Sequence, residues 1–104
     1  MVKKRLLILD IETTGLDPID NKIILIGIKD NRGLNETIPA FGEDGEKNCI
    51  LRFFKQIRDL KPTIVGGYNS ASFDWPFILK RAELLGINVE NETKVFTNQG
   101  MSQK

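Results

Sequence analysis

Two carboxylates stand one residue apart in Asp10-Ile-Glu12, at the end of an apolar run that begins near Arg5. On an extended strand, residues i and i+2 point to the same face, so we expect these two side chains to be neighbours. Neighbouring carboxylates repel each other unless a cation lies between them, and Mg²⁺ and Mn²⁺ prefer such all-oxygen surroundings. The alternative is a strand end with two solvated acids, and the Asp-x-Glu pattern alone fits both.

A second polar segment, residues 68–76, surrounds Asp74 and includes Asn69 and Phe73. Asp74 opens a predicted helix, where an acid is favoured by the helix dipole, so a capping role explains it as well as a catalytic one. The segment also follows a predicted strand, and binding sites in α/β sheets form at the carboxyl ends of strands. Asp74 is therefore a candidate third carboxylate of the same site.

The composition excludes several kinds of catalytic chemistry. The sequence has no histidine and a single cysteine, which rules out imidazole bases, Ser-His or Cys-His pairs and His-ligated zinc. Cys49 lies in an apolar run and is predicted to be a buried thiol, in a reducing, cytoplasmic setting. No apolar stretch has the length of about 20 residues that crosses a membrane. The net charge of +1 predicts local, metal-assisted contact with any nucleic acid.

The hydrophobic pattern predicts one small α/β domain over residues 1–97 and a C-terminal tail over residues 98–104. Three strands should form an antiparallel meander, and a fourth, which follows a helix, should run parallel to the first. We expect the first strand to be covered on both faces, because it is continuously apolar as far as Asp10. The predicted strands cover residues 5–11, 22–28, 34–40 and 63–67, the helices 46–60 and 74–85, and an irregular strand 87–96.

This order of elements is that of the first two-thirds of a ribonuclease H-like fold, and two segments carry a closer resemblance. Asp10-Ile-Glu-Thr-Thr-Gly-Leu16 resembles the first exonuclease motif of the DEDD superfamily. Residues 61–87 are similar to the second motif of the proofreading 3′→5′ exonuclease domain of family B DNA polymerases. Its Asn69, the Phe-Asp pair, Pro76, the Arg-Ala pair and Leu-Gly-Ile87 make this combination specific. The resemblance covers about residues 5–87.

The resemblance implies two-metal hydrolysis of the 3′-terminal phosphodiester of a single-stranded nucleic acid, with DNA favoured. Asp10 would bridge two divalent ions, Mg²⁺ or Mn²⁺, while Glu12 would ligate one of them and Asp74 the other. Five residues are implied to bind substrate. Thr13, Thr14 and Leu16 would hold the 3′-terminal nucleotide, and Asn69 and Phe73 would contact the strand that leads to it.

The sequence departs from the family beyond Asp74. The family's third motif, Tyr-x-x-x-Asp or His-x-x-x-x-Asp, has no counterpart, because no Asp follows Asp74 and no Tyr follows Tyr68.

Three interpretations remain. The chain is a minimal exonuclease whose missing ligand comes from a partner chain or from Glu90 or Glu92; or it is an accessory module that binds nucleic acid without cleaving it; or it is a fragment of a longer polymerase-like protein. Because the last strand and helix of the fold are missing, we expect residues 63–67 to form an exposed edge covered by a partner chain, most simply in a homodimer.

Overall fold

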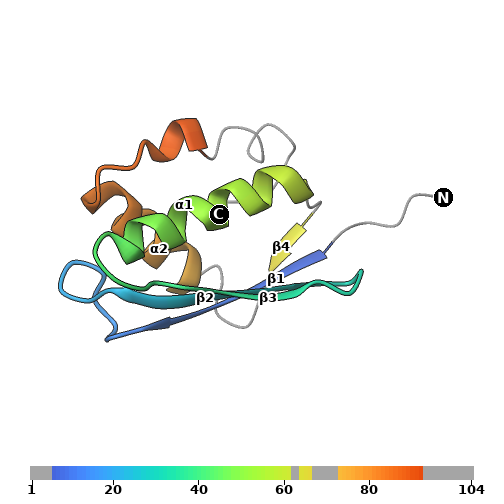
Figure 1. Ribbon diagram of the computed structural model, residues 1–104, viewed down its shortest axis with the longest axis horizontal. Helices are drawn as coiled ribbons and strands as arrows, with labels where there is room; N and C mark the ends of the chain where they lie inside the picture. The colour runs from blue at the N-terminus through green and yellow to red at the C-terminus, as the bar shows by residue number, and fades with distance from the viewer. Residues whose placement is uncertain (1–5, 62–63, 67–72, 93–104) are drawn as a thin grey trace.

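The computed structural model describes residues 6–61, 64–66 and 73–92, which follow one another in the order β-β-β-α-β-α (Figure 1). The order and type of these elements are those that the sequence predicts. The strands are β1 (Leu6–Thr13), β2 (Ile23–Asp30), β3 (Asn35–Pro39) and β4 (Ile64–Gly66), and the helices are α1 (Gly45–Leu60) and α2 (Trp75–Leu84).

The strands form one sheet in the order β3-β2-β1-β4. β1 is antiparallel to β2 and parallel to β4, which confirms the predicted meander with a parallel fourth strand. The register shifts at the end of β1, where Glu12 faces Leu25 but Thr13 faces Ile23. Such a bulge bends the strand and re-aims the side chains beside it. The bend therefore lies where the candidate site begins.

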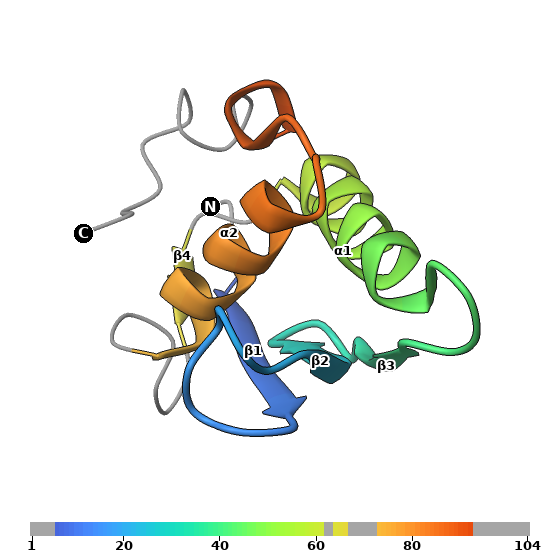
Figure 2. The same ribbon diagram turned by 90° about the vertical axis from the view of Figure 1, so that its left-hand side faces the viewer.

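Both helices lie on the same side of the sheet (Figure 2). Side chains alternate along β1, so Leu7, Leu9 and Ile11 are buried beneath the helices, together with Phe53 and Phe54 of α1. The other side of the sheet, which carries Leu6, Ile8, Asp10 and Glu12 on β1, is exposed, and we call it the open face. Ile8 is 51% exposed there. The prediction that β1 is covered on both faces is thus wrong for the described residues, because both helices pack against one face only.

The predicted irregular strand at residues 87–96 is also wrong where the structure describes it, because residues 89–92 form a helical turn. Asn88 begins this turn, since its Oδ1 accepts a hydrogen bond of 3.0 Å from the Asn91 amide, as an N-cap residue does. The Glu92 amide donates to the Asn88 carbonyl at 3.0 Å. Residues 93–97, and the predicted boundary between domain and tail, lie outside the described residues.

Two smaller predictions are confirmed, one on the ends of α2 and one on Cys49. Pro76 lies in the first turn of α2, and Gly86 follows its end with a φ of +80°, a conformation that glycine adopts readily. Cys49 is buried, and burial raises the pKa of its thiol to about 11, so this side chain is part of the core and not a nucleophile. No helix in the described ranges has the length and apolar character needed to cross a membrane.

Candidate active site

The two acids of β1 open onto a groove on the open face. Asp10 and Glu12 are both exposed, and the residue paired with Asp10 on β2 is Gly27, which has no side chain to fill the space beside the carboxylate. The groove has a volume of about 610 Å³. Its lining includes Ile8 and Lys29 as well as the two acids. As the sequence predicts, Asp10 and Glu12 lie on the same face of one strand, and the structure leaves both side chains exposed.

Asp74 is buried, with only 3% of its surface exposed. It occupies the N-cap position of α2 but makes no capping hydrogen bond to that helix, which the structure describes in full. Its carboxylate instead accepts a hydrogen bond from the backbone of Ile11 on β1. The capping explanation that the sequence left open therefore does not account for this side chain. The start of α2 presents the Asp74 carboxylate to the strand that carries Asp10.

Burial and a neighbouring charge together make the Asp74 carboxylate hard to ionise. Its pKa is raised to about 6, first because burial disfavours the charged form and second because Asp10 repels it. The hydrogen bond from Ile11 offsets only part of this effect. A divalent cation placed between Asp10 and Asp74 would remove the repulsion and stabilise both carboxylates. The pair therefore fits Mg²⁺ or Mn²⁺, which bind oxygen ligands of this kind.

Glu12, the third predicted ligand, is not gathered with Asp10 and Asp74 into one cluster. Within the described parts of the chain, no three acidic, cysteine or histidine side chains gather closely enough to hold an ion together. Glu12 thus shares a strand face with Asp10 without forming a preassembled cluster with Asp10 and Asp74.

Glu92 forms an ion pair with Arg58 of α1, in the helical layer on the other side of the sheet from the open face (Figure 1). The Glu92 carboxylate is therefore not available as a metal ligand beside Asp10 in the same molecule.

The side chains predicted to hold a nucleotide lie at the end of β1, which is Thr13, and in the loop of residues 14–22 that follows it. Both threonine hydroxyls are engaged within this region: Thr13 Oγ1 donates to the Gly15 carbonyl at 2.6 Å, and Thr14 Oγ1 accepts from the Lys22 amide at 2.9 Å. Leu16, by contrast, is 82% exposed. The hydroxyls therefore shape the loop, and their contact with a nucleotide stays a prediction.

Leu16 and Phe73, which are distant in sequence, line the same small apolar notch. The notch has a volume of about 120 Å³, and Pro18, Pro76 and Phe77 complete its walls. The Phe73 ring is half-buried and packs against Phe77 with 5.3 Å between ring centroids. Phe73 is thus both packed against α2 and open to a ligand. Asn69, the remaining predicted contact, lies outside the described residues.

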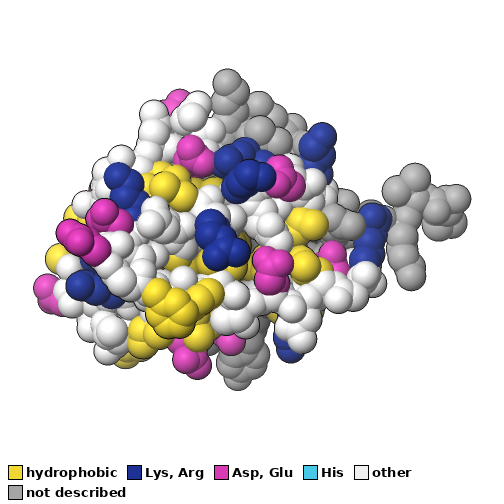
Figure 3. Space-filling model, viewed as in Figure 1, with side chains coloured by type: hydrophobic (Ala, Val, Ile, Leu, Met, Phe, Trp, Pro, Cys, Tyr) yellow, Lys and Arg dark blue, Asp and Glu magenta, His cyan; other side chains and the backbone are white. Residues whose placement is uncertain are grey.

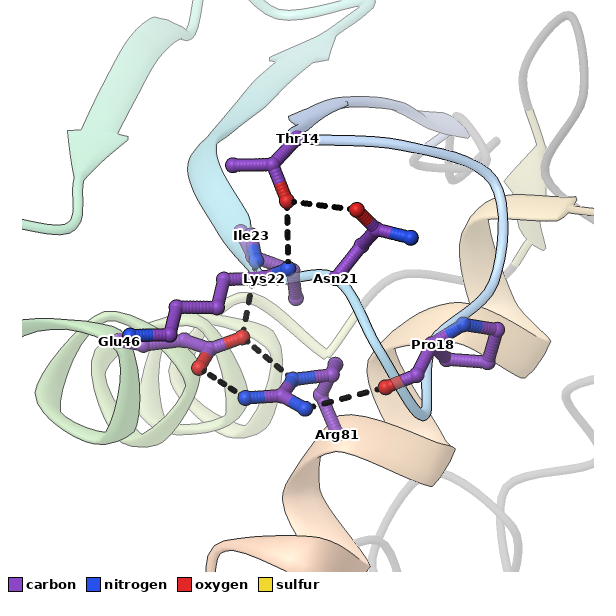
Figure 4. Close-up of polar contacts among 7 residues, drawn as sticks. All are labelled: Thr14, Pro18, Asn21, Lys22, Ile23, Glu46 and Arg81. Atoms are coloured by element: carbon purple, nitrogen blue, oxygen red, sulfur yellow. Dashed lines mark hydrogen bonds and ion pairs between the residues drawn. The ribbon is translucent and has the colours of Figure 1, made fainter.

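Sequence reasoning missed one buried ion pair, between Glu46 in the first turn of α1 and Arg81 in the last turn of α2 (Figure 4). The two side chains are each 10% exposed. The signal in the sequence is that Arg81 directly precedes Ala82 and follows Ile78 by three positions, on the buried stripe of its helix. A charged residue on such a stripe requires a buried partner. The partner is separated by 35 residues and could not be identified from spacing.

Figure 3 shows Lys and Arg intermixed with Asp and Glu over the visible face of the molecule. This mixture is consistent with the net charge of +1.

The sheet thus carries two acids on β1, and the helix that follows β4 begins with a third. The family model for the exonuclease domain of DNA polymerase family B matches residues 17–103, a range that includes Asp74 and Arg81. The chain belongs to this family.

Known relatives agree with this assignment. The catalytic polypeptide of DNA polymerase epsilon from Aspergillus fumigatus is 46% identical over 52 residues, which are 50% of this chain and 2% of the relative. DNA polymerase 2 of Aeropyrum pernix is 34% identical over 74 residues, 70% of this chain and 9% of the relative. The family B DNA polymerase of Pyrobaculum calidifontis matches in structure with a TM-score of 0.75 and 31% identity, over 83% of this chain and 12% of that one. The chain thus corresponds to part of an exonuclease domain and to a small share of these polymerases.

Proposed function

We propose that this protein binds divalent cations and the 3′ end of a single-stranded nucleic acid, DNA in preference to RNA, and hydrolyses the terminal phosphodiester. The observation that carries the proposal is the position of Asp74. Its carboxylate is buried against β1, does not cap its own helix, and has its pKa raised by burial and by Asp10. A buried carboxylate that a neighbouring carboxylate repels is typical of a functional site that a cation completes.

In this proposal, Asp10 and Asp74 hold Mg²⁺ or Mn²⁺, and Glu12, on the same strand face as Asp10, adds a further oxygen ligand. The bound ions would supply a hydroxide nucleophile and stabilise charge in an in-line displacement. Asp74 has to lose its proton to become a ligand, so ion binding should release a proton near pH 6 and lower its pKa.

The apolar notch supplies a place for the 3′-terminal base. Leu16 is exposed on one wall and Phe73 is half-exposed on the other, so a base entering the notch would contact an aliphatic and an aromatic side chain. Contacts of this kind accept every base, because each base has an apolar π-face. Thr13 and Thr14 would contribute backbone groups of the loop, and Asn69 would contact the strand next to the terminal nucleotide.

A second candidate function is binding without cleavage, as an accessory module. The observation that favours it is that Glu92, a candidate for the missing ligand, is paired with Arg58. The loss of one metal ligand and of the group that orients water would remove several kcal/mol of transition-state stabilisation. In that case the ions and the 3′ end would still bind at the site described above.

Labelled oligonucleotides distinguish these functions. Single strands of DNA and RNA carrying a label at the 3′ or the 5′ end are incubated with Mn²⁺ or with a chelator. We expect early loss of the 3′ label, stepwise shortening of 5′-labelled strands from their 3′ end, and no reaction with chelator. Cleavage that begins at the 5′ end, or that continues in chelator, would contradict the proposal. Mn²⁺-dependent binding without shortening would select the accessory module.

A partner chain is part of the same proposal. Among the described strands, β4 lies at one edge of the sheet, and Leu6 and Ile8 are 40% and 51% exposed on the open face beside it. An unpaired edge next to exposed aliphatic side chains favours association. We propose that a second copy of the chain covers this region in a two-fold dimer. The reducing, cytoplasmic setting predicted from the single cysteine also stays a proposal.

Light scattering at micromolar concentration measures this association. We expect the mass of a dimer for the natural sequence and of a monomer for Ile8→Lys, because a charge on the open face would be buried without a partner. Ile19→Lys is the matched control, since Ile19 is 62% exposed in the 14–22 loop and away from the open face. A monodisperse monomer of the natural sequence would show that the fold is stable without a partner chain and would contradict the dimer proposal.

A further inference from the structure

The Glu46–Arg81 pair joins the two helices with a planar, two-point contact. Arg81 Nε donates to Glu46 Oε2 at 2.7 Å, and Nη2 donates to Oε1 at 2.6 Å. Burial of both side chains keeps water from competing for these bonds. A bidentate contact fixes direction as well as distance, because the guanidinium fork and the carboxylate lie in one plane.

Each member of the pair also holds a point of the polypeptide next to the nucleotide-binding region (Figure 4). The third guanidinium nitrogen of Arg81, Nη1, donates to the Pro18 carbonyl at 3.0 Å. Glu46 Oε2 accepts a further hydrogen bond of 2.8 Å from the Ile23 amide. Pro18 lies in the middle of the 14–22 loop and Ile23 follows its last residue, so the pair attaches the loop to both helices.

The ends of the loop are closed by its own hydrogen bonds. The Thr14 amide donates to the Lys22 carbonyl at 2.9 Å, and the Lys22 amide donates to Thr14 Oγ1 at 2.9 Å. Asn21 Nδ2 donates to the Asp17 carbonyl at 3.0 Å. These bonds set the shape of the loop but do not attach its middle to α2. The bond from Arg81 to Pro18 is the polar contact that does so.

We propose that Arg81 is a positioning residue that sets the width of the notch between Leu16 and Phe73 and thereby the binding of the 3′-terminal nucleotide. Pro18 belongs to the loop and lines the notch, while Pro76 and Phe77 on the opposite wall belong to α2, the helix of Arg81. The bond from Arg81 to Pro18 therefore fixes one wall relative to the other. This inference rests on the proposed function, since it assigns the notch to the 3′-terminal base.

Stability alone does not require a charged pair at this place. A buried ion pair can often be replaced by apolar or neutral side chains of similar size without loss of stability, whereas removal of one partner leaves a costly lone charge. A neutral pair at positions 46 and 81 would still fill the space but would not donate to the Pro18 carbonyl. The two roles of Arg81 can therefore be separated by substitution.

Three variants make this separation. Arg81→Lys keeps the charge but loses the fork and its third donor. The double variant Glu46→Gln/Arg81→Met removes both charges, so that neither is left buried alone, and it carries the test if Arg81→Lys does not fold. Lys80→Met is the control on the same helix, because Lys80 pairs only at the surface with Glu83, at 3.3 Å. Melting curves identify the variants that are folded at the temperature of the assay.

The readout compares two single-stranded DNAs with 2-aminopurine either at the 3′ terminus or at an internal position, in the presence of Mn²⁺. We expect Arg81→Lys and the double variant to bind the 3′-terminal probe at least about tenfold more weakly, as a small misplacement of contact groups does. Binding of Mn²⁺, followed by its electron paramagnetic resonance, should stay unchanged, and Lys80→Met should behave like the natural sequence.

The outcomes separate this inference from the proposed function. If the natural sequence does not sense the 3′-terminal probe, the proposed function fails and the inference fails with it. If the natural sequence senses it and both folded Arg81 variants sense it equally well, only the inference is overturned. If Mn²⁺ affinity falls together with probe binding, Arg81 supports the whole domain and does not position the loop, which also overturns the inference.

Discussion

Replacing Asp74 with asparagine is expected to stabilise the metal-free protein at pH 7. The pKa of Asp74 is about 6 in the folded protein, against about 3.9 for an aspartate in an unfolded chain. The folded state therefore holds this proton more tightly than the unfolded state does. The stability that comes from the bound proton is complete below about pH 4 and is lost as the pH rises through 6. Asparagine stays neutral at every pH and can still accept the hydrogen bond from Ile11.

The expected gain in the free energy of unfolding at pH 7 is about 2 to 3 kcal/mol, since each pKa unit corresponds to roughly 1.4 kcal/mol. Denaturant unfolding with chelator at pH 7 and at pH 4 measures the difference, which should vanish at the lower pH. Asp20→Asn, at an exposed position in the 14–22 loop, should change stability by less than about 0.5 kcal/mol. A less stable Asp74→Asn at pH 7 would mean that the carboxylate is needed for folding and is not strained by Asp10.

Replacing Asp10 with alanine is expected to slow the Mn²⁺-dependent loss of the 3′ label strongly. Asp10 lies on the open face and interacts with Asp74, so its removal takes away the oxygen ligand that the two proposed ions share. The expected loss is about 100- to 1,000-fold, the usual effect of removing one group that stabilises charge in a transition state.

The control for this variant is Glu43→Ala, which removes an exposed acid from the loop before α1, away from the groove and the notch. It should retain the full rate. Initial rates with saturating Mn²⁺ and a 3′-labelled strand give both values. Equal rates for Asp10→Ala and the natural protein would show that the cleavage comes from another site or from a contaminating nuclease.

The main features of the fold were predictable because they depend on local patterns. Alternation and apolar runs defined the strands, helical spacing defined α1, and Pro76 and Gly86 defined the ends of α2. The exposed face of β1 was not predictable, because an apolar residue such as Ile8 has the same type whether a helix covers it or not. The turn at residues 89–92 was missed because its start depends on one capping side chain, that of Asn88.

The candidate site was predictable in its residues but not in its geometry. The spacing of Asp10 and Glu12 placed them on one strand face, and the resemblance to the exonuclease family added Asp74. Only the structure shows that Asp74 turns away from its own helix and toward β1. The pairing of Glu46 with Arg81 depends on the packing of two helices and on the path of a loop, so no local pattern contains it.

The proposed site requires Asp10 and Asp74 to hold a divalent cation together. Adding substoichiometric Mn²⁺ to the ¹⁵N-labelled protein shows where the ion binds, because the ion broadens the amide signals of residues that lie near it. If Asp10 and Asp74 share the ion, the signals of Asp10, Ile11 and Asp74 broaden first, and this selective broadening is lost in both Asp10→Asn and Asp74→Asn. Selective broadening at acids other than Asp10, Glu12 and Asp74, or the same broadening of these three signals in the Asp10→Asn protein, would contradict a shared site.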